Sequence, residues 1–79
     1  MPKHYHVHEG PVGCIPDSCT YHTSKREAYA EAARRAREMR EIGYHVKGTA
    51  QKGYACNDGI AYIEVVECDD STHRPEDYD

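Results

Sequence analysis

Three histidines alternate along the first strand-like stretch of this 79-residue chain. His4, His6 and His8 stand at every second position, so in an extended strand their imidazoles share one face and lie about 6.6 to 7 Å apart. Neighbouring pairs can share a divalent metal ion, and a closed tetrahedral site then needs a fourth ligand such as His45 or Cys19. The Cys-x-x-Cys spacing that brackets many zinc modules is missing. The pattern therefore favours a solvent-facing strand, and we expect no metal and no other cofactor.

Four cysteines, Cys14, Cys19, Cys56 and Cys68, offer further ligands or nucleophiles. Cys14 and Cys19 flank a proline-containing loop, which suits a loop disulfide, whereas all four thiols together suit a zinc site. A cysteine nucleophile would need a recognisable turn and an orienting carboxylate, which the sequence does not supply, so we expect no enzyme. No apolar signal-peptide core is visible at the N-terminus, so we expect a cytoplasmic protein with free or packed thiols.

One long helix, predicted over residues 24–43, is the element around which these groups must be arranged. Ser24 and Glu27 have the spacing of a capping box, and Gly43 tolerates the left-handed backbone that ends many helices. Small and apolar side chains recur at three- and four-residue steps, which predicts one buried stripe. This stripe consists of Ala28, Tyr29, Ala32, Ala33, Ala36 and Met39.

Short strands account for most of the remaining chain. Alternating or β-prone residues predict strands at 4–9, 20–23, 44–51, 54–56 and 60–67. The tripeptide Asn57-Asp58-Gly59 accepts positive φ and predicts the turn of a hairpin. The last strand is partly apolar on both faces, so we expect it at the centre of the sheet or at an interface, where it would also allow a homodimer.

The predicted architecture is an α+β domain of two layers. Its element order is β(β)αβββ, with one helix on one face of a small antiparallel sheet. Residues 1–68 form this single domain, because a chain of this length has no room for two cores. Residues 69–79 show no periodic apolar face and are predicted to be an acidic, flexible C-terminal tail.

Charge is unevenly distributed along the chain, whose net charge is −4. Residues 64–79 contain seven acids against Arg74 alone, which suits either a solubilising tail or a basic partner surface. The helix is richer in arginine, but Glu31, Glu38 and Glu41 each stand four residues from an arginine and favour intrahelical ion pairs. Direct nucleic-acid binding is therefore not expected, and neither is a membrane partner, since no apolar run is long enough to span a bilayer.

The chain resembles the small single-domain proteins that phages and prophages encode, a group that includes anti-CRISPR inhibitors. The likeness lies in the short length, the single helix on an antiparallel sheet, the seven tyrosines, the acidic balance and the lack of a catalytic motif. The resemblance implies a non-enzymatic protein that binds a CRISPR effector subunit and occupies its nucleic-acid path with acidic side chains.

We therefore expect a protein-binding module that mimics nucleic acid on the basic surface of a host complex. The residues expected to contact the partner are Tyr62, Glu64, Glu67, Asp69 and Asp70. Two alternatives stay open. One is a small structural domain stapled by a metal ion on Cys and His side chains, with His4, His6, His8, Cys14 and Cys19 as candidate ligands. The other is a nucleic-acid binder that uses the arginines of its helix.

Overall fold

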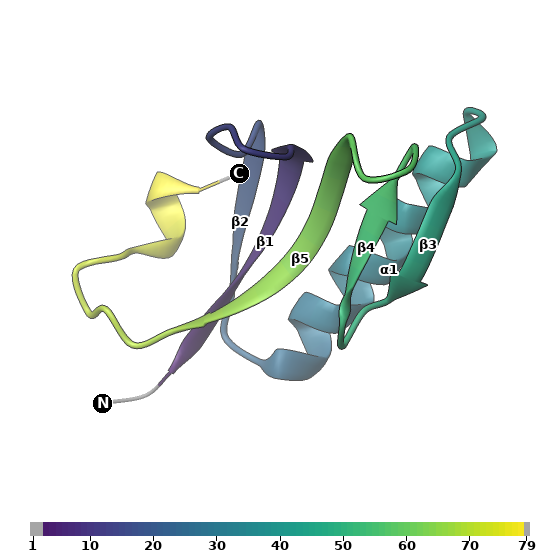
Figure 1. Ribbon diagram of the computed structural model, residues 1–79. Helices are drawn as coiled ribbons and strands as arrows, with labels where there is room; N and C mark the ends of the chain where they lie inside the picture. The colour runs from purple at the N-terminus through teal and green to yellow at the C-terminus, as the bar shows by residue number, and fades with distance from the viewer. Residues whose placement is uncertain (1–2, 79) are drawn as a thin grey trace.

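The computed structural model describes residues 3–78, which form a five-stranded antiparallel sheet with one long helix on one of its faces (Figure 1). The strands are β1 (His4–Pro11), β2 (Ser18–His22), β3 (Val46–Thr49), β4 (Gly53–Cys56) and β5 (Ala61–Cys68). The helix is α1 (Lys25–Glu41), and a short 3-10 helix, η1 (Pro75–Asp77), follows the sheet. The predicted α+β class and the order β(β)αβββ are confirmed.

The two long strands lie side by side in the middle of the sheet. The strand order is β2-β1-β5-β4-β3, and β1 pairs antiparallel with β5 along its whole length, from His4 opposite Cys68 to Pro11 opposite Ala61. The central place predicted for the last strand is thus confirmed. This pairing joins the two ends of the chain, and it therefore decides which N-terminal side chains meet the C-terminal ones.

The loop between the first two strands is shorter than the sequence predicts, because β1 continues through Gly10 and Pro11. The pairing of β1 with β2 ends where Glu9 faces Ser18, so Pro11 lies where β1 has a strand on one side only. Proline is tolerated at such positions. Gly10 is needed because a Cβ there would lie 2.8 Å from the backbone nitrogen of Asp17.

The helix begins and ends as its sequence predicts. Ser24 is the N-cap, and its hydroxyl accepts a hydrogen bond from the Glu27 backbone N–H at 3.1 Å. The helix ends before Gly43, whose φ of +104° is left-handed. The fully buried residues of the stripe are Ala28, Ala32 and Ala36, which pack with Val7, Cys56 and Ile63 of the sheet.

The hairpin between β4 and β5 turns at the predicted tripeptide, where Asn57, Asp58 and Gly59 have φ of 50°, 60° and 91°. This turn places β4 beside β5. Gly48 in β3 is a point of close approach between strands, since a Cβ there would collide with the backbone oxygen of Gly53.

The segment after β5 turns back toward β1 and β2 (Figure 1, yellow). Because side chains alternate along a strand, His4 and His6 lie on the sheet face opposite Val7 and the helix. His73 and Tyr78 lie against these two histidines. The sequence did not predict this return. The mobility of residues 69–79 stays a prediction, and Asp79 lies outside the described residues.

Candidate metal centre

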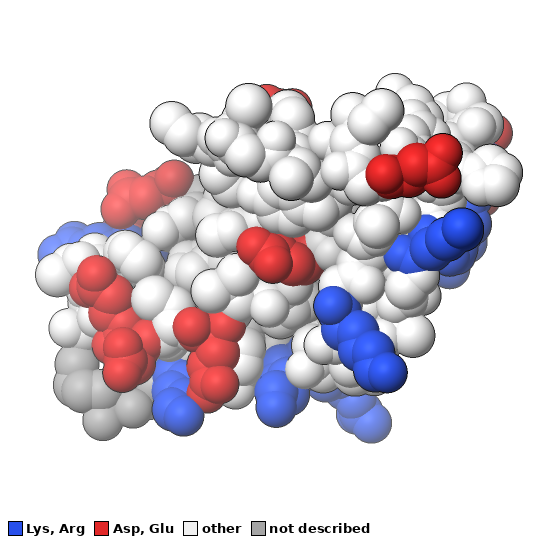
Figure 2. All heavy atoms as spheres, viewed as in Figure 1, with Lys and Arg blue, Asp and Glu red and all other residues white. Residues whose placement is uncertain are grey.

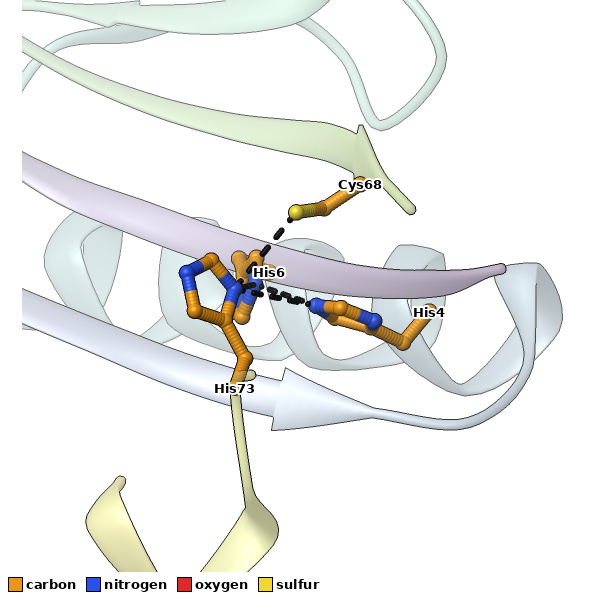
Figure 3. A group of neighbouring side chains, drawn as sticks. All are labelled: His4, His6, Cys68 and His73. Atoms are coloured by element: carbon orange, nitrogen blue, oxygen red, sulfur yellow. Dashed lines mark hydrogen bonds between the residues drawn. The ribbon is translucent and has the colours of Figure 1, made fainter. Parts of the chain in front are cut away.

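Four side chains that metals favour converge on the sheet face opposite the helix (Figure 3). His4 and His6 come from β1, Cys68 is the last residue of β5, and His73 comes from the segment that follows. One ligand atom from each residue lies within 4.8 Å of all the others. The two strand histidines are buried, at 5% and 4% exposure, and the other two residues are half-buried.

The spacing of the ligand atoms is close to that of a tetrahedral zinc site. His4 Nε2 lies 2.9 Å from His6 Nε2 and 3.2 Å from His73 Nδ1, and His6 Nε2 lies 3.3 Å from His73 Nδ1. Cys68 Sγ lies 3.5 Å from His73 Nδ1. Zinc bonds of about 2.1 Å to nitrogen and about 2.3 Å to sulfur place two nitrogens about 3.4 Å apart, and nitrogen and sulfur about 3.6 Å apart. Four of the six distances between the ligand atoms are therefore close to those of a zinc site, and the other two, from Cys68 Sγ to the nitrogens of His4 and His6, are no longer than 4.8 Å.

The proton on His6 is placed so that the ring can bind a metal. Its Nδ1 lies 3.1 Å from the backbone oxygen of Thr20, which can only accept, so Nδ1 carries the hydrogen. In the neutral ring, Nε2 then presents its lone pair to the cluster. Burial lowers the pKa of His6, and the charges of neighbouring histidines lower it further. The hydrogen bond to Thr20 raises the pKa but does not outweigh them. The neutral form is the one that ligates metal.

The carboxylate of Asp70 lies beside the second ring nitrogen of His73, as the Thr20 oxygen lies beside that of His6. His73 Nδ1 faces the cluster, and Nε2 of the same ring lies 3.5 Å from Asp70 Oδ2. Asp70 is fixed in turn by Thr72, whose backbone N–H and hydroxyl donate to Oδ1 at 2.9 and 2.6 Å, and these bonds hold the pKa of Asp70 below its usual value. A carboxylate on the second nitrogen of a ligating histidine orients the ring and raises its basicity.

Hydrogen bonds can join the side chains of the cluster in the metal-free protein. His6 Nε2 is an acceptor, so a hydrogen on His4 Nε2 can bridge that pair, and the Cys68 thiol can donate to His73 Nδ1. A metal ion at the centre would instead accept the lone pairs of all three nitrogens and of the sulfur.

Two tyrosines cover the cluster. Tyr21 stacks on His4 with ring centroids 4.6 Å apart and an interplanar angle of 17°, and Tyr78 packs on His6 at 4.8 Å. The two tyrosine rings also pack on each other at 5.8 Å. Flat aromatic rings on the ligands restrict the access of water and fix the imidazole planes.

The structure divides the ligand candidates that the sequence suggested. His4 and His6 belong to the cluster. His8 lies on the same strand face, but its ring stacks on His6 at 6.1 Å and it does not join the four ligands. Cys14 and Cys19 are also outside the cluster, and neither forms a disulfide. Cys56 lies in the core, where its thiol donates to Met39 Sδ at 3.7 Å, so the four thiols do not form one site.

Of the four candidate ligands, sequence reasoning missed His73, and it grouped Cys68 with the other three thiols rather than with the histidines. The signal was a His-x-His pair near one end of the chain and a Cys-x4-His pair near the other. Neither pair suffices alone, because each supplies only two ligands. Only the β1–β5 register, which sets His4 opposite Cys68, brings the pairs together.

The predicted partner-contact residues differ in their local contacts. All four acids are exposed, but Glu67 pairs with Lys3 Nζ at 2.7 Å and Asp70 lies beside His73, while Glu64 and Asp69 form no ion pair among residues 3–78. Tyr62 is half-buried and lines a shallow hollow with Glu64 and residues of the β1–β2 loop. Acidic side chains gather near the end of β5 and the C-terminal segment, with basic ones among them (Figure 2).

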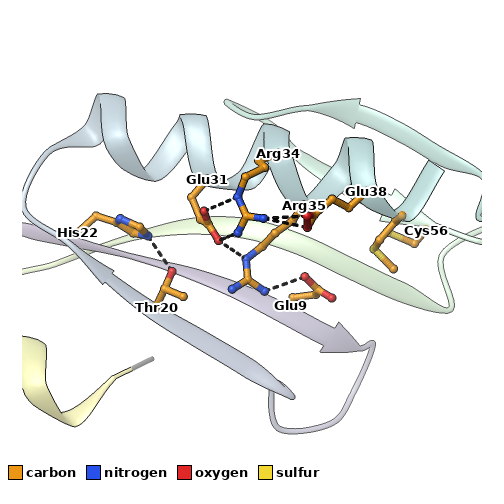
Figure 4. A network of polar contacts seen from close by, with 9 residues as sticks. Glu9, Thr20, His22, Glu31, Arg34, Arg35, Glu38 and Cys56 are labelled. Carbon is orange, nitrogen blue, oxygen red and sulfur yellow. Dashed lines mark hydrogen bonds and ion pairs between the residues drawn. The ribbon is translucent and has the colours of Figure 1, made fainter. Parts of the chain in front are cut away.

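Two arginines of the helix, Arg34 and Arg35, are engaged by carboxylates (Figure 4). Arg34 bonds to Glu31 and Glu38, at 2.6 and 2.9 Å. Arg35 is less exposed and bridges Glu31 to Glu9 of β1, at 2.7 and 2.9 Å. Burial opposes the charge on Arg35, but the bonds to Glu9 and Glu31 prevail and raise its pKa. The predicted intrahelical pairing is therefore confirmed for Arg34 and Arg35.

No family model, curated protein or solved structure matches this chain. Within residues 3–78, no helix has both the length and the apolar character needed to cross a membrane.

Proposed function

We propose that this protein is a small zinc-binding domain, in which His4, His6, Cys68 and His73 hold one ion that fastens the two ends of the chain together. The observation that carries the proposal is the convergence of four ligand atoms within 4.8 Å of one another, with four of the six distances between them close to the edges of a zinc tetrahedron. Nitrogen and sulfur ligands favour zinc over magnesium or calcium, which prefer oxygen. Four protein ligands leave no open position, so the role is structural rather than catalytic.

The size of the domain explains why an ion would be useful. Among residues 3–78, the fully buried apolar residues are six, and three of them are alanines. A core this small contributes little stability, and domains in this size range often depend on a metal or on disulfides. In the cytoplasm, where we place the protein, disulfides are rare and Cys68 stays available as a thiolate ligand.

The test is metal binding by the purified protein. We expect one zinc per chain, and with Co²⁺ we expect the visible absorption of a tetrahedral site with a thiolate ligand. At zinc concentrations about 100 times Kd, binding adds about 2.7 kcal/mol, which for this size corresponds to roughly 10–20 °C in Tm. A chelator should remove that increment.

Matched variants make the assignment specific. Cys68→Ser and His6→Gln should lose the cobalt spectrum, whereas Cys14→Ser and His8→Gln, from outside the cluster, should keep it. A metal-free preparation whose Tm is unchanged by added zinc or by chelator would contradict the proposal, as would equal binding by all four variants.

A second proposal, compatible with the first, concerns partners. We propose that the acidic end binds a basic protein surface, and the resemblance to phage-encoded inhibitors points to a nucleic-acid-handling complex such as a CRISPR effector. The supporting observation is that Glu64 and Asp69 are exposed and form no ion pair among residues 3–78. Carboxylates free in this way can meet a cationic surface.

A further inference from the structure

The segment of residues 69–78, which we call the C-terminal strap, is tied to the rest of the protein at two points only among the described residues. His73 meets His4 and His6, and Tyr78 packs on His6 and Tyr21. The other strap residues are exposed. The burial that would hold the strap on the sheet is therefore concentrated in two side chains.

Among residues 69–78, no backbone group forms a hydrogen bond with the backbone of the sheet. The backbone bonds of the strap are internal and run from His73 N to Asp70 O, from Asp77 N to Arg74 O and from Tyr78 N to Pro75 O. These bonds shape a turn and the single turn of η1, but they do not attach either to β1 or β2. A segment with few buried contacts and no ladder bonds belongs to the low-stability end of a fold.

The two attachment points have different dependences on the ion. Of the four proposed ligands, His4, His6 and Cys68 lie on paired strands and keep their places through the β1–β5 register. His73 alone comes from outside the sheet. Tyr78 follows it five residues later and lies on the ring of a ligand, His6. Loss of the ion therefore removes the bond that positions His73, and the hold of Tyr78 weakens with it.

We infer that zinc acts as the clasp of the C-terminal strap, so that metal binding closes residues 69–78 over β1 and β2 and metal loss releases them. This inference rests on the zinc site proposed above. Release uncovers Tyr21 and the imidazoles of His4 and His6, an aromatic patch on the sheet face opposite the helix. The surface that the protein presents to partners would then depend on its metal state.

The experiment measures backbone order in the zinc-loaded and the chelator-treated full chain by NMR relaxation. With zinc we expect strap order parameters near those of the sheet, about 0.8 or higher, and without zinc values below about 0.6. The amides of α1 serve as the internal reference for a folded domain. His73→Ala with excess zinc should stay folded and show a mobile strap, while His45→Ala, which removes an exposed histidine outside the cluster, should behave as the unaltered chain.

Each outcome decides between the two proposals. Zinc binding at one equivalent with strap order that does not change would overturn the clasp and leave the zinc domain standing. Absence of zinc binding would remove both. If the metal-free chain unfolds as a whole, the His73→Ala protein decides: an ordered strap in that variant contradicts the clasp, and a mobile strap on an ordered α1 supports it.

Discussion

A histidine that ligates a metal needs a partner for its second ring nitrogen, and the two best-defined histidines of the cluster have one. His6 uses the backbone oxygen of Thr20, and His73 uses the carboxylate of Asp70. The backbone partner cannot be removed by substitution, but the carboxylate can. Asp70, which the sequence suggested as a partner contact, thus acquires a testable role in metal binding.

We predict that Asp70→Asn lowers zinc affinity by about 10- to 100-fold, because the ring of His73 loses its orienting carboxylate. Asp69→Asn is the matched control, since Asp69 is exposed and adjacent. Competition with a zinc-binding dye measures both affinities. Equal affinities for the two variants would mean that Asp70 does not act through His73.

Glu31 is the second residue whose role can be isolated. Burial would raise its pKa, but hydrogen bonds from Arg34 and Arg35 prevail and lower it. A carboxyl with a lowered pKa stabilises the fold above its unfolded pKa, and this contribution disappears as the pH falls through the folded value.

We therefore predict that Glu31→Gln destabilises the protein at neutral pH by roughly 0.5–1 kcal/mol, because solvent screens part of the pairing. The difference from the unaltered chain should vanish in acid, as the pH falls below about 4.3. Urea unfolding across this range measures it. Glu41→Gln, which removes an exposed carboxylate with no ion pair among residues 3–78, is the matched control and should cost less stability at neutral pH. A difference for Glu31→Gln that stays constant across the pH range would contradict the pairing.

At the scale of elements, the helix lies close to the sheet because its buried stripe is made of alanine. Ala28, Ala32 and Ala36 are fully buried against Val7 and Ile63. Interiors are packed without room for extra methyl groups, so this contact tolerates little added volume.

Ala32→Leu should destabilise the domain by about 1–3 kcal/mol, because the larger side chain forces the helix away from the sheet. Ala30→Leu is the control: Ala30 is exposed on the same helix, and its replacement should change Tm little. Thermal unfolding monitored by circular dichroism compares the two. If Ala32→Leu melts no lower than Ala30→Leu, the helix–sheet contact is looser than described.

The register of β1 against β5 has consequences for the site. His4 faces Cys68 and His6 faces Val66, so alternation along both strands sets the ligands on the face away from the helix. A slip of one residue would turn the histidines into the core and Val7 out of it. The hydrophobic core therefore also specifies the proposed metal site, since both depend on one register.

At the scale of the whole molecule, the acidic end provides the test of partner binding. Glu67 and Asp70 have local roles, with Lys3 and His73, so reversing their charge would disturb structure as well as binding. Glu64 and Asp69 form no ion pair among residues 3–78, so reversing their charge tests partner binding without disturbing a local contact.

We predict that the double variant Glu64→Lys, Asp69→Lys captures a basic partner from a lysate of the native host about tenfold more weakly than the unaltered chain. Its Tm should not fall. Glu27→Lys with Glu41→Lys changes the net charge equally on the helix and should retain capture. Mass spectrometry of the retained proteins compares the pairs. Equal loss with both would indicate a non-specific effect of charge, and no loss with either would contradict the proposal.

Local sequence determined much of the fold. The helix ends follow from Ser24 and Gly43, and the hairpin follows from Asn57 and its two neighbours, because capping and positive φ are properties of a few adjacent residues. The face of the helix was equally readable, since periodicity within one element fixes it. The intrahelical ion pairs of Arg34 and Arg35 followed from the same spacing.

Only the tertiary structure decided the metal cluster and the return of the C-terminal strap. His4 and His73 lie 69 positions apart, and no local pattern indicates that their rings meet at 3.2 Å. Their meeting depends on β1 pairing with β5 rather than with another strand, and such pairing is set by the packing of the whole core. The sequence by itself thus determined which elements form and which side chains can ligate. The non-local register determined which of those side chains share one point in space.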